Sequence, residues 1–275
     1  MPEQPRVLSI AGTDPTGGAG VQADLKSIAA QGGYAMAVVT CLVAQNTRGV
    51  RSVHTPPTSF LVEQLDAVSD DVQIDAVKIG MLGDHATVEA VRAWLVRVAP
   101  PVVVLDPVMV STSGHRLLED DAESAVRDLV ELIDLVTPNL EELAVLTGEP
   151  RVDGWAGALD QARRLSAATG TVVLAKGGHL TDAGCPDALV DARGRLPGEV
   201  CEVTGPRVAT RNTHGTGCSL SAAMATRRVI DGSWSAALHT VKPWLLGALA
   251  HADGLQVGTG NGPIDHFHHL RRPTP

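Results

Sequence analysis

Short apolar runs alternate with longer amphipathic segments along almost the whole chain, and this alternation limits the possible folds more than any other feature. The apolar runs have the length of strands and lie at Arg6–Ala11, Tyr34–Ala44, Ala76–Ile79, Val102–Asp106, Leu135–Thr137 and Val172–Lys176. The amphipathic segments have the length of helices and lie at Gly20–Gln31, Thr58–Ser69, Asp84–Val98, Ala122–Leu132, Asn139–Thr147, Trp155–Ala168, Gly217–Ile230 and Ser235–His251. A repeated strand–helix order predicts an α/β fold with a mostly parallel central sheet and helices on both faces.

Two segments carry more detailed expectations. Tyr34–Ala44 is apolar throughout, which predicts a strand buried on both of its faces. Asp187–Val203 contains Gly194 and Pro197 and is typical of a hairpin with looser pairing. Because the 275 residues contain no internal repeat and no linker, we expect one domain that spans residues 1–275.

Composition and charge argue against several classes of protein. The net charge is −9 and no basic cluster is present, so nucleic acid is not an expected partner. The four cysteines have no C-x-x-C spacing, which argues against a disulfide framework and against a thiolate zinc site. No apolar run approaches membrane length and no signal-peptide pattern opens the chain, so we expect a cytoplasmic protein that does not bind membranes.

Polar or glycine-rich stretches follow the strands and should line one cleft, because open parallel sheets bind ligands beyond the carboxyl ends of their strands. The first of these stretches runs from Gly12 to Gly20 and allows a close backbone approach. It has neither the P-loop nor the dinucleotide glycine spacing, so a ligand loop and a plain tight turn remain equal alternatives. Asp24 follows one helical turn later, either as a solvated residue or facing a ligand.

The stretch T-H-G-T-G-C-S-L-S-A-A, from Thr213 to Ala223, has a sharper signature. Gly215 and Gly217 free the backbone at a helix start, where converging N–H groups favour an anion such as a transferring phosphoryl group. The alternative is a glycine-loosened helix end that packs closely on a strand. Cys218 at this position should have its thiol pKa lowered by the helix end, unless it is an inert buried cysteine.

Three charged residues are candidates for a metal and phosphate site. Asp106 ends a strand, and Glu142 lies in the first turn after Asn139, where helix capping is the simpler explanation. Two such carboxylates can hold Mg²⁺ through water beside nucleotide phosphates, and Lys176 would neutralise phosphate charge. The tract H-F-H-H, from His266 to His269, is interpreted as a solvent-exposed tail rather than a metal site.

Eight stretches in order make the chain similar to the hydroxymethylpyrimidine/phosphomethylpyrimidine kinases of thiamine biosynthesis, which are members of the ribokinase-like superfamily. These stretches are S-I-A-G-T-D-P-T-G-G-A-G-V-Q-A-D-L-K, L-V-A-Q-N-T, K-I-G-M-L, L-D-P-V-M, T-P-N-L-E-E, A-K-G-G-H, N-T-H-G-T-G-C and G-P-I-D-H-F-H. The resemblance implies a ribokinase-like three-layer α/β/α sandwich and an ATP- and Mg²⁺-dependent kinase. It implies transfer of phosphate to 4-amino-5-hydroxymethyl-2-methylpyrimidine and then to its monophosphate, and a homodimer.

The same resemblance implies roles for individual residues. Asp24 and Gln45 would bond the aminopyrimidine in a pocket shaped by Gly12, Ala19, Met81 and Val108. Asn139, Lys176 and Thr213 would handle ATP phosphates, and Asp106 and Glu142 would hold Mg²⁺. Gly215, Thr216, Gly217 and Cys218 would form the anion hole, with Cys218 at the substrate hydroxyl. Sugar kinases of the superfamily carry an aspartate base where Cys218 stands, and a thiol is a weaker base.

Two rival functions remain open at this stage. A pyridoxal kinase has the same cysteine-type loop, but Gln45 favours an aminopyrimidine, because an amide both donates to a ring nitrogen and accepts from an amine. A binding module on a kinase fold would not need the full set of charged residues. The loops at Ser111–Arg116 and Asp182–Pro186 are candidate lids.

Overall fold

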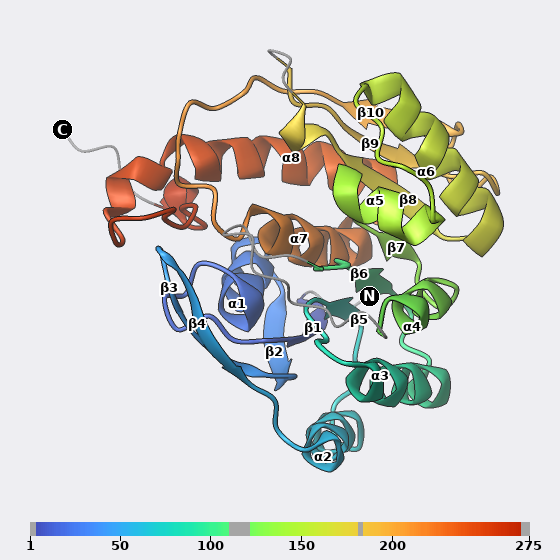
Figure 1. Ribbon diagram of the computed structural model, residues 1–275, viewed down its shortest axis with the longest axis vertical. Helices are drawn as coiled ribbons and strands as arrows, with labels where there is room; N and C mark the ends of the chain where they lie inside the picture. The colour runs from blue at the N-terminus through green and yellow to red at the C-terminus, as the bar shows by residue number, and fades with distance from the viewer. Residues whose placement is uncertain (1–3, 110–121, 181–183, 271–275) are drawn as a thin grey trace.

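A computed structural model describes residues 4–109, 122–180 and 184–270, and within them eight strands form one sheet (Figure 1). The strand order across the sheet is β10-β9-β8-β7-β6-β5-β1-β2. The strands are β1 (Arg6–Ala11), β2 (Tyr34–Val39), β5 (Ala76–Ile79), β6 (Val103–Leu105), β7 (Leu135–Val136), β8 (Val172–Lys176), β9 (Asp187–Val190) and β10 (Val200–Val203). All pairs from β2 to β8 are parallel, whereas β9 is antiparallel to both of its neighbours. The predicted mostly parallel sheet is confirmed, as is the β9–β10 hairpin.

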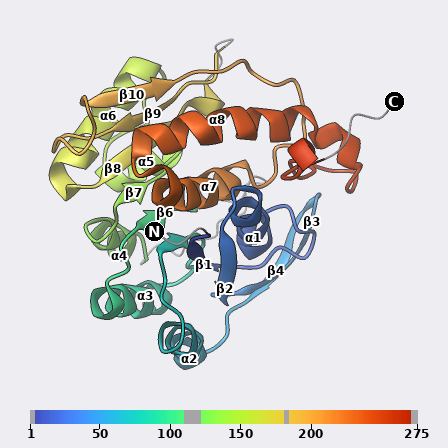
Figure 2. The ribbon, with the colours of Figure 1, turned by 180° about the vertical axis from the view of Figure 1, so that it is seen from behind.

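Helices cover the sheet on two faces and make the three layers that were expected. The helices are α1 (Gly20–Ala30), α2 (Thr58–Ser69), α3 (His85–Val98), α4 (Ala122–Val130), α5 (Leu140–Thr147), α6 (Trp155–Thr169), α7 (Thr216–Asp231) and α8 (Trp234–Ala250), with short 3-10 turns at Gly177–His179, Ala252–Leu255 and His268–Leu270. One core joins the sheet to α2 through α6, and the other joins it to α1, α7 and α8. In both views α7 lies between α1 and α8 (Figures 1 and 2). The first turn of α7 lies beside Asp106 and Lys176 at the carboxyl ends of the central strands.

The prediction of one doubly buried strand at Tyr34–Ala44 is wrong. β2 ends at Val39 and is the edge strand of the sheet, with the Tyr34 side chain 58% exposed. The chain then starts a separate hairpin, in which β3 (Leu42–Asn46) pairs with β4 (Gly49–His54). The apolar run does not distinguish these cases, because an edge strand and a hairpin that shields a site also bear apolar side chains. This hairpin carries Gln45.

The C-terminal histidine tract is also not the exposed tail that was expected. His266 is 3% exposed, and its Nε2 lies 2.9 Å from the Ser219 hydroxyl oxygen of α7. The indole N–H of Trp244 donates to the His266 carbonyl, and within the tract only His269 is exposed. Tertiary packing against α7 and α8 therefore decides this segment. In the described part of the chain, no helix combines the length and apolarity that a membrane crossing needs.

Candidate active site

Charged side chains from β6, β8 and α5 meet at the carboxyl edge of the sheet, as the pattern of polar stretches predicted. Lys176 at the end of β8 places its Nζ 3.0 Å from Asp106 Oδ1 and 3.9 Å from Glu142 Oε2. Thr137 donates a further hydrogen bond of 3.1 Å to the same Asp106 oxygen. Adjacent parallel strands bring these residues together although they are far apart in sequence. The candidate metal pair and the candidate phosphate lysine therefore form one cluster.

Glu142 also has the structural role that its position suggested. The Asn139 side chain accepts a hydrogen bond from the Glu142 N–H, and Glu142 accepts one from the Asn139 N–H, so the two form a capping box for α5. Burial raises the pKa of Glu142 to about 7; the charge of Lys176 opposes this rise, and the negative charge of Asp106 adds to it. Burial also works against the ionised Asp106, but Lys176 and Lys78 outweigh it and lower the pKa of Asp106.

The backbone from Gly215 to Cys218 at the start of α7, here called the cradle, lies beside this charged cluster. Gly215 is the N-cap residue with φ of +79°, so the chain turns sharply into the helix. A Cβ on Gly217 would lie 3.4 Å from both Asp106 Oδ2 and Lys176 Nζ. The glycine thus leaves open the space between the helix N-terminus, the carboxylate and the ammonium. Asp106 and Glu142 carry the hard oxygen donors that Mg²⁺ prefers, with the Lys176 ammonium beside both of them.

The glycine-rich N-terminal loop packs directly against this cradle. This contact favours the interpretation of the N-terminal loop as a ligand loop. A Cβ on Gly215 would lie 1.7 Å from the Gly18 carbonyl oxygen, so the two backbones are in direct contact. Asp14 is fully buried and accepts hydrogen bonds from the Gly18 and Ala19 N–H groups at 3.0 and 2.8 Å. Its Oδ2 also lies 2.8 Å from His214 Nε2. Burial opposes the ionised form of Asp14, but the hydrogen bonds from His214 and Thr16 prevail and hold its pKa well below the usual range.

The expectation of a lowered thiol pKa at Cys218 is wrong. Cys218 is partly exposed in the first turn of α7, yet burial of the thiol raises its pKa to about 11. Lys78 favours the thiolate, but the carboxylates of Asp24 and Asp106 oppose it. The helix end does not overcome desolvation and two nearby negative charges. At neutral pH this residue is a thiol, suited to orient a hydroxyl rather than to remove its proton in advance.

Alkylation should reveal this raised pKa. At pH 7.5 a thiol with a pKa of about 11 contains about 300-fold less thiolate than an unperturbed cysteine. We expect Cys218 to react with iodoacetamide far more slowly than a model cysteine peptide, and its rate to increase tenfold per pH unit up to at least about pH 10. Peptide mapping by mass spectrometry measures this rate. A rate that levels off near pH 7 would contradict the raised pKa.

The residues expected around a substrate lie in four different segments. A Cβ on Gly12 would lie 2.6 Å from Cys41 Sγ and 3.5 Å from Met81 Sδ, so the loop and the segment after β5 are packed together. Val108 follows Asp106 and donates its N–H to the Asp106 carbonyl. Gln45 lies in β3, opposite Val50 of β4. The loop at Ser111–Arg116 lies outside the described residues, as do residues 182 and 183 of the other proposed lid.

Asp24 is more enclosed than the resemblance implies. Its Oδ2 accepts hydrogen bonds from Lys78 Nζ at 2.9 Å and from Ser9 Oγ at 2.6 Å, and Asp24 and Lys78 are fully buried. No partner for its buried Oδ1 is found among the described residues. In this conformation a pyrimidine reaches the carboxylate only if its neighbours move. The sequence interpretation missed Lys78, although a lysine inside the apolar strand Ala76–Ile79 was a signal for a buried charge pair.

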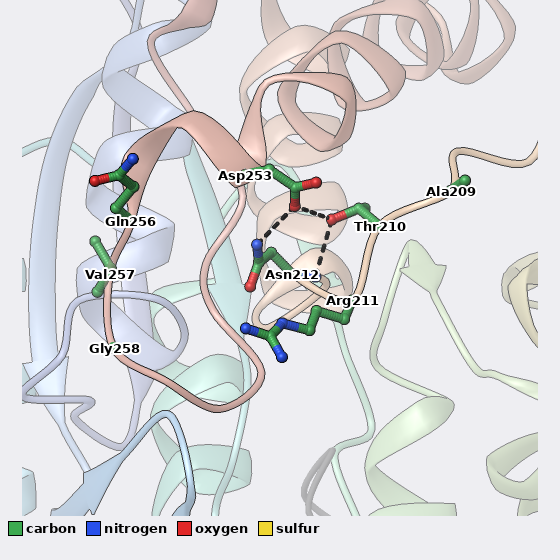
Figure 3. Close-up of a pocket in the computed structure, with 8 residues that line it drawn as sticks. All are labelled: Ala209, Thr210, Arg211, Asn212, Asp253, Gln256, Val257 and Gly258. Atoms are coloured by element: carbon green, nitrogen blue, oxygen red, sulfur yellow. Dashed lines mark hydrogen bonds between the residues drawn. The ribbon is translucent and has the colours of Figure 1, made fainter.

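Thr213 joins the cradle to an open cavity of about 650 Å³ (Figure 3). The cavity is lined by Ala209, Thr210, Arg211, Asn212, Asp253, Gln256, Val257 and Gly258. Asp253 accepts hydrogen bonds from Thr210 and Asn212, at 2.5 and 2.7 Å, and the three lie together on one side of the cavity (Figure 3). The Thr213 N–H donates to Asn261 Oδ1 at 2.9 Å. Sequence reasoning did not identify these cavity residues, because their loops have no characteristic spacing.

Comparison with known proteins identifies the family. A sequence profile described as "Phosphomethylpyrimidine kinase" matches residues 14–265. The chain is a member of the phosphomethylpyrimidine kinase family. The family resemblance deduced from the eight stretches is therefore confirmed.

Individual relatives agree with this family. The hydroxymethylpyrimidine/phosphomethylpyrimidine kinase of Escherichia coli is 48% identical over 262 residues, which are 95% of this chain and 97% of the relative. The thiamine biosynthesis multifunctional protein ThiED of Corynebacterium efficiens is 55% identical over 98% of this chain. The chain spans only 36% of that relative's length.

A solved structure supports the expected fold. Bacillus subtilis pyridoxal kinase, solved as an ADP complex, has a TM-score of 0.87 and 28% identity, with 98% of this chain and all of that chain covered. The chain thus has the ribokinase-like fold. The pyridoxal kinase shares this fold, so the fold alone does not select the substrate.

Proposed function

We propose that the chain phosphorylates 4-amino-5-hydroxymethyl-2-methylpyrimidine with ATP and then phosphorylates the monophosphate, as a step of thiamine biosynthesis. The observation that carries this proposal is that Asp106, Glu142 and Lys176 form a cluster beside the cradle of α7 in a member of this family. A binding module has no need for a metal-type carboxylate pair beside an anion cradle. Residues 1–275 would act as one kinase domain in the cytoplasm, where ATP is available.

The charged cluster and the cradle would have different roles in phosphoryl transfer. The N–H groups at the start of α7, from Gly215 to Cys218, would hold the transferring group, and the helix dipole would favour its negative charge. Lys176 would balance charge on the donor phosphates, with Asn139 and Thr213 beside it. Asp106 and Glu142 would hold Mg²⁺, which supplies charge neutralisation at the phosphate oxygens. Because the transition state is loose, positioning contributes more than early proton removal.

The acceptor alcohol would lie between the N-terminal loop and the hairpin. Gln45 would bond the aminopyrimidine edge, and the backbone of Gly12 and Ala19 with Met81 and Val108 would shape the pocket. The Cys218 thiol would orient the hydroxymethyl oxygen towards the cradle, and the proton of that hydroxyl would pass late in the transfer to an oxygen of the phosphoryl group. Asp24 would bond the ring only after a local rearrangement around Lys78. The base of ATP would occupy the cavity that adjoins Thr213 (Figure 3).

A coupled assay with ATP and Mg²⁺ tests the proposal, with hydroxymethylpyrimidine, its monophosphate, pyridoxal and ribose offered side by side. We expect turnover of both pyrimidines well above the other two compounds. Turnover of pyridoxal alone would favour the second candidate, a pyridoxal kinase, which the likeness to the Bacillus subtilis structure supports. Binding of the pyrimidine without any turnover would favour a sensor.

The raised pKa of Glu142 predicts a pH-dependent metal affinity. The folded chain holds a proton on Glu142 up to about pH 7, whereas an unfolded glutamate loses it near 4.5. Without metal, this carboxyl therefore contributes less to the free energy of unfolding as pH rises from 4.5 to about 7. Because Mg²⁺ must displace the proton, its apparent affinity should rise by up to about tenfold per pH unit in this range and then level off.

Isothermal titration of the protein with Mg²⁺ measures this dependence. Glu142→Gln should bind Mg²⁺ weakly and with a flat pH profile. Glu141→Gln is the matched control, because Glu141 is 57% exposed and its ion pair with Arg151 lies outside the cluster. An unchanged pH profile in Glu142→Gln would remove Glu142 from the proposed metal site.

We also propose that the chain forms a homodimer through the hairpin side of the sheet. The edge strand β2 is unpaired on its outer side in the described sheet, and exposed apolar residues occur on it (Tyr34) and on the hairpin that follows it (Leu42 and Val53). Exposed apolar side chains beside an open strand edge favour association. Sedimentation analysis tests this: a monomer at micromolar concentration would refute it.

A further inference from the structure

The segment from Gly258 to Gly262, here called the strap, lies between the nucleotide side and the acceptor side of the site. On one side it continues from Gln256 and Val257, which line the cavity opposite Asn212 (Figure 3). On the other side it contacts the turn between β3 and β4. The proposed function uses only Gly258 of this segment, as one of the residues that line the cavity.

Backbone contacts hold the strap against the hairpin turn. The Asn261 N–H donates to the Thr47 carbonyl at 2.8 Å, and the Gly260 N–H donates to the Thr47 hydroxyl at 3.2 Å. A Cβ on Gly260 would lie 2.0 Å from the Thr47 carbonyl oxygen, so only glycine allows this approach. Thr47 is two residues from Gln45. The position of the hairpin turn, and with it that of Gln45, therefore depends on the strap.

The same strap holds the loop that leads into the cradle. Asn261 Oδ1 accepts a hydrogen bond from the Thr213 N–H at 2.9 Å. The Gly262 N–H donates to Asn212 Oδ1 at 2.9 Å, and the Gly262 carbonyl accepts from the His214 N–H at 3.0 Å. Asn261 thus makes hydrogen bonds to both segments: its side chain accepts one from Thr213, and its backbone N–H donates one to Thr47.

We propose that Asn261 is a positioning residue that couples the two substrates, so that a nucleotide in the cavity strengthens binding of the pyrimidine alcohol at Gln45. This inference rests on the proposed function. A nucleotide that contacts both walls of the cavity restrains the strap, and the strap restrains the hairpin turn. The second ligand then meets a hairpin that is already ordered. By linkage, the pyrimidine strengthens nucleotide binding by the same factor.

Titration calorimetry of the full chain measures this coupling. The probe ligands are hydroxymethylpyrimidine and the non-hydrolysable nucleotide AMP-PCP with Mg²⁺, each titrated alone and in the presence of the other. We expect wild-type protein to bind the pyrimidine at least about fivefold more tightly with AMP-PCP than without it. In Asn261→Ala this factor should fall to about one, while the affinity for AMP-PCP alone changes less than about threefold. A merely structural role would weaken both ligands and leave their ratio unchanged.

Gly260→Ala tests the same contact between the strap and the hairpin turn through another residue. It also tests the proposed coupling if Asn261→Ala is insoluble. Its Cβ would push Thr47 away, so the coupling factor should again fall to about one. Gly254→Ala is the matched glycine control, because no atom of the described structure lies within 4 Å of its added Cβ. Asn46→Ala is the matched asparagine control, since Asn46 Oδ1 accepts only the Arg48 N–H within the hairpin. Both controls should keep the wild-type factor.

The outcomes separate this inference from the proposed function. If wild-type protein turns over both pyrimidines but its coupling factor is one, the proposed function stands and the coupling is refuted. A factor that stays at the wild-type value in both Asn261→Ala and Gly260→Ala also refutes it. If wild-type protein turns over neither pyrimidine, the proposed function itself fails.

Discussion

Asp106→Asn is expected to lower kcat/KM by about 100- to 1000-fold, and to lower the melting temperature because it removes the charge paired with the largely buried Lys176 ammonium. The substitution keeps the shape of the side chain and removes its charge, which Mg²⁺ and Lys176 would both use. Among the described residues, the carboxyl group that then remains beside Lys176 is that of Glu142, at 3.9 Å. The larger part of the effect should fall on kcat, because charge at the phosphate oxygens grows in the transition state. Steady-state kinetics with saturating Mg²⁺ measures it.

Asp75→Asn is the matched control for this substitution. Asp75 is also a buried carboxylate bonded to a cation, with Arg6 Nε 2.7 Å from its Oδ2, but it lies at the opposite edge of the sheet. We expect it to lower the melting temperature and to leave kcat/KM within about twofold of wild type. A loss smaller than tenfold in Asp106→Asn, at unchanged metal dependence, would show that Asp106 does not hold the metal.

Gly215→Ala should abolish most activity and weaken the fold. Two costs coincide at this residue: φ is +79°, and the added Cβ would lie 1.7 Å from the Gly18 carbonyl oxygen. Both contacting groups are backbone, so the N-terminal loop and the cradle must separate. We expect kcat/KM to fall at least about 100-fold, because a displacement of about 1 Å at reacting groups has that effect. The free energy of unfolding should fall by about 2–4 kcal/mol.

Gly232→Ala separates the two costs. Gly232 ends the same helix with φ of +75°, but no described atom lies within 4 Å of its added Cβ. In Gly232→Ala the free energy of unfolding should therefore fall only by the conformational cost of about 1–2 kcal/mol, and kcat/KM should be unchanged. Thermal unfolding and kcat/KM of both variants give the comparison. Equal loss of activity in the two variants would contradict a direct role of the contact between Gly215 and Gly18.

The alternation of strand and helix patterns was enough to predict the layers of this fold. Most predicted elements agree with the structure to within a residue or two, since a long amphipathic helix and a doubly buried parallel strand each have a distinct pattern. The same reasoning located Asp106 and Lys176 at strand ends, and hence at one edge of the sheet. It failed at Tyr34–Ala44, where an apolar run does not reveal that the chain leaves the sheet after Val39.

The sequence by itself determined the sheet, the family and the position of the cradle, because local periodicity and short ordered motifs encode them. Only the tertiary structure decided the electrostatics. The thiol of Cys218 is at a helix start, but its pKa depends on burial and on Lys78, Asp24 and Asp106, which other elements supply. Likewise, the strap bonds Thr47 and Thr213 through Asn261, although the two threonines are far apart in sequence. Distances between charges and bonds between distant segments arise only when the chain is packed, so no local pattern contains them.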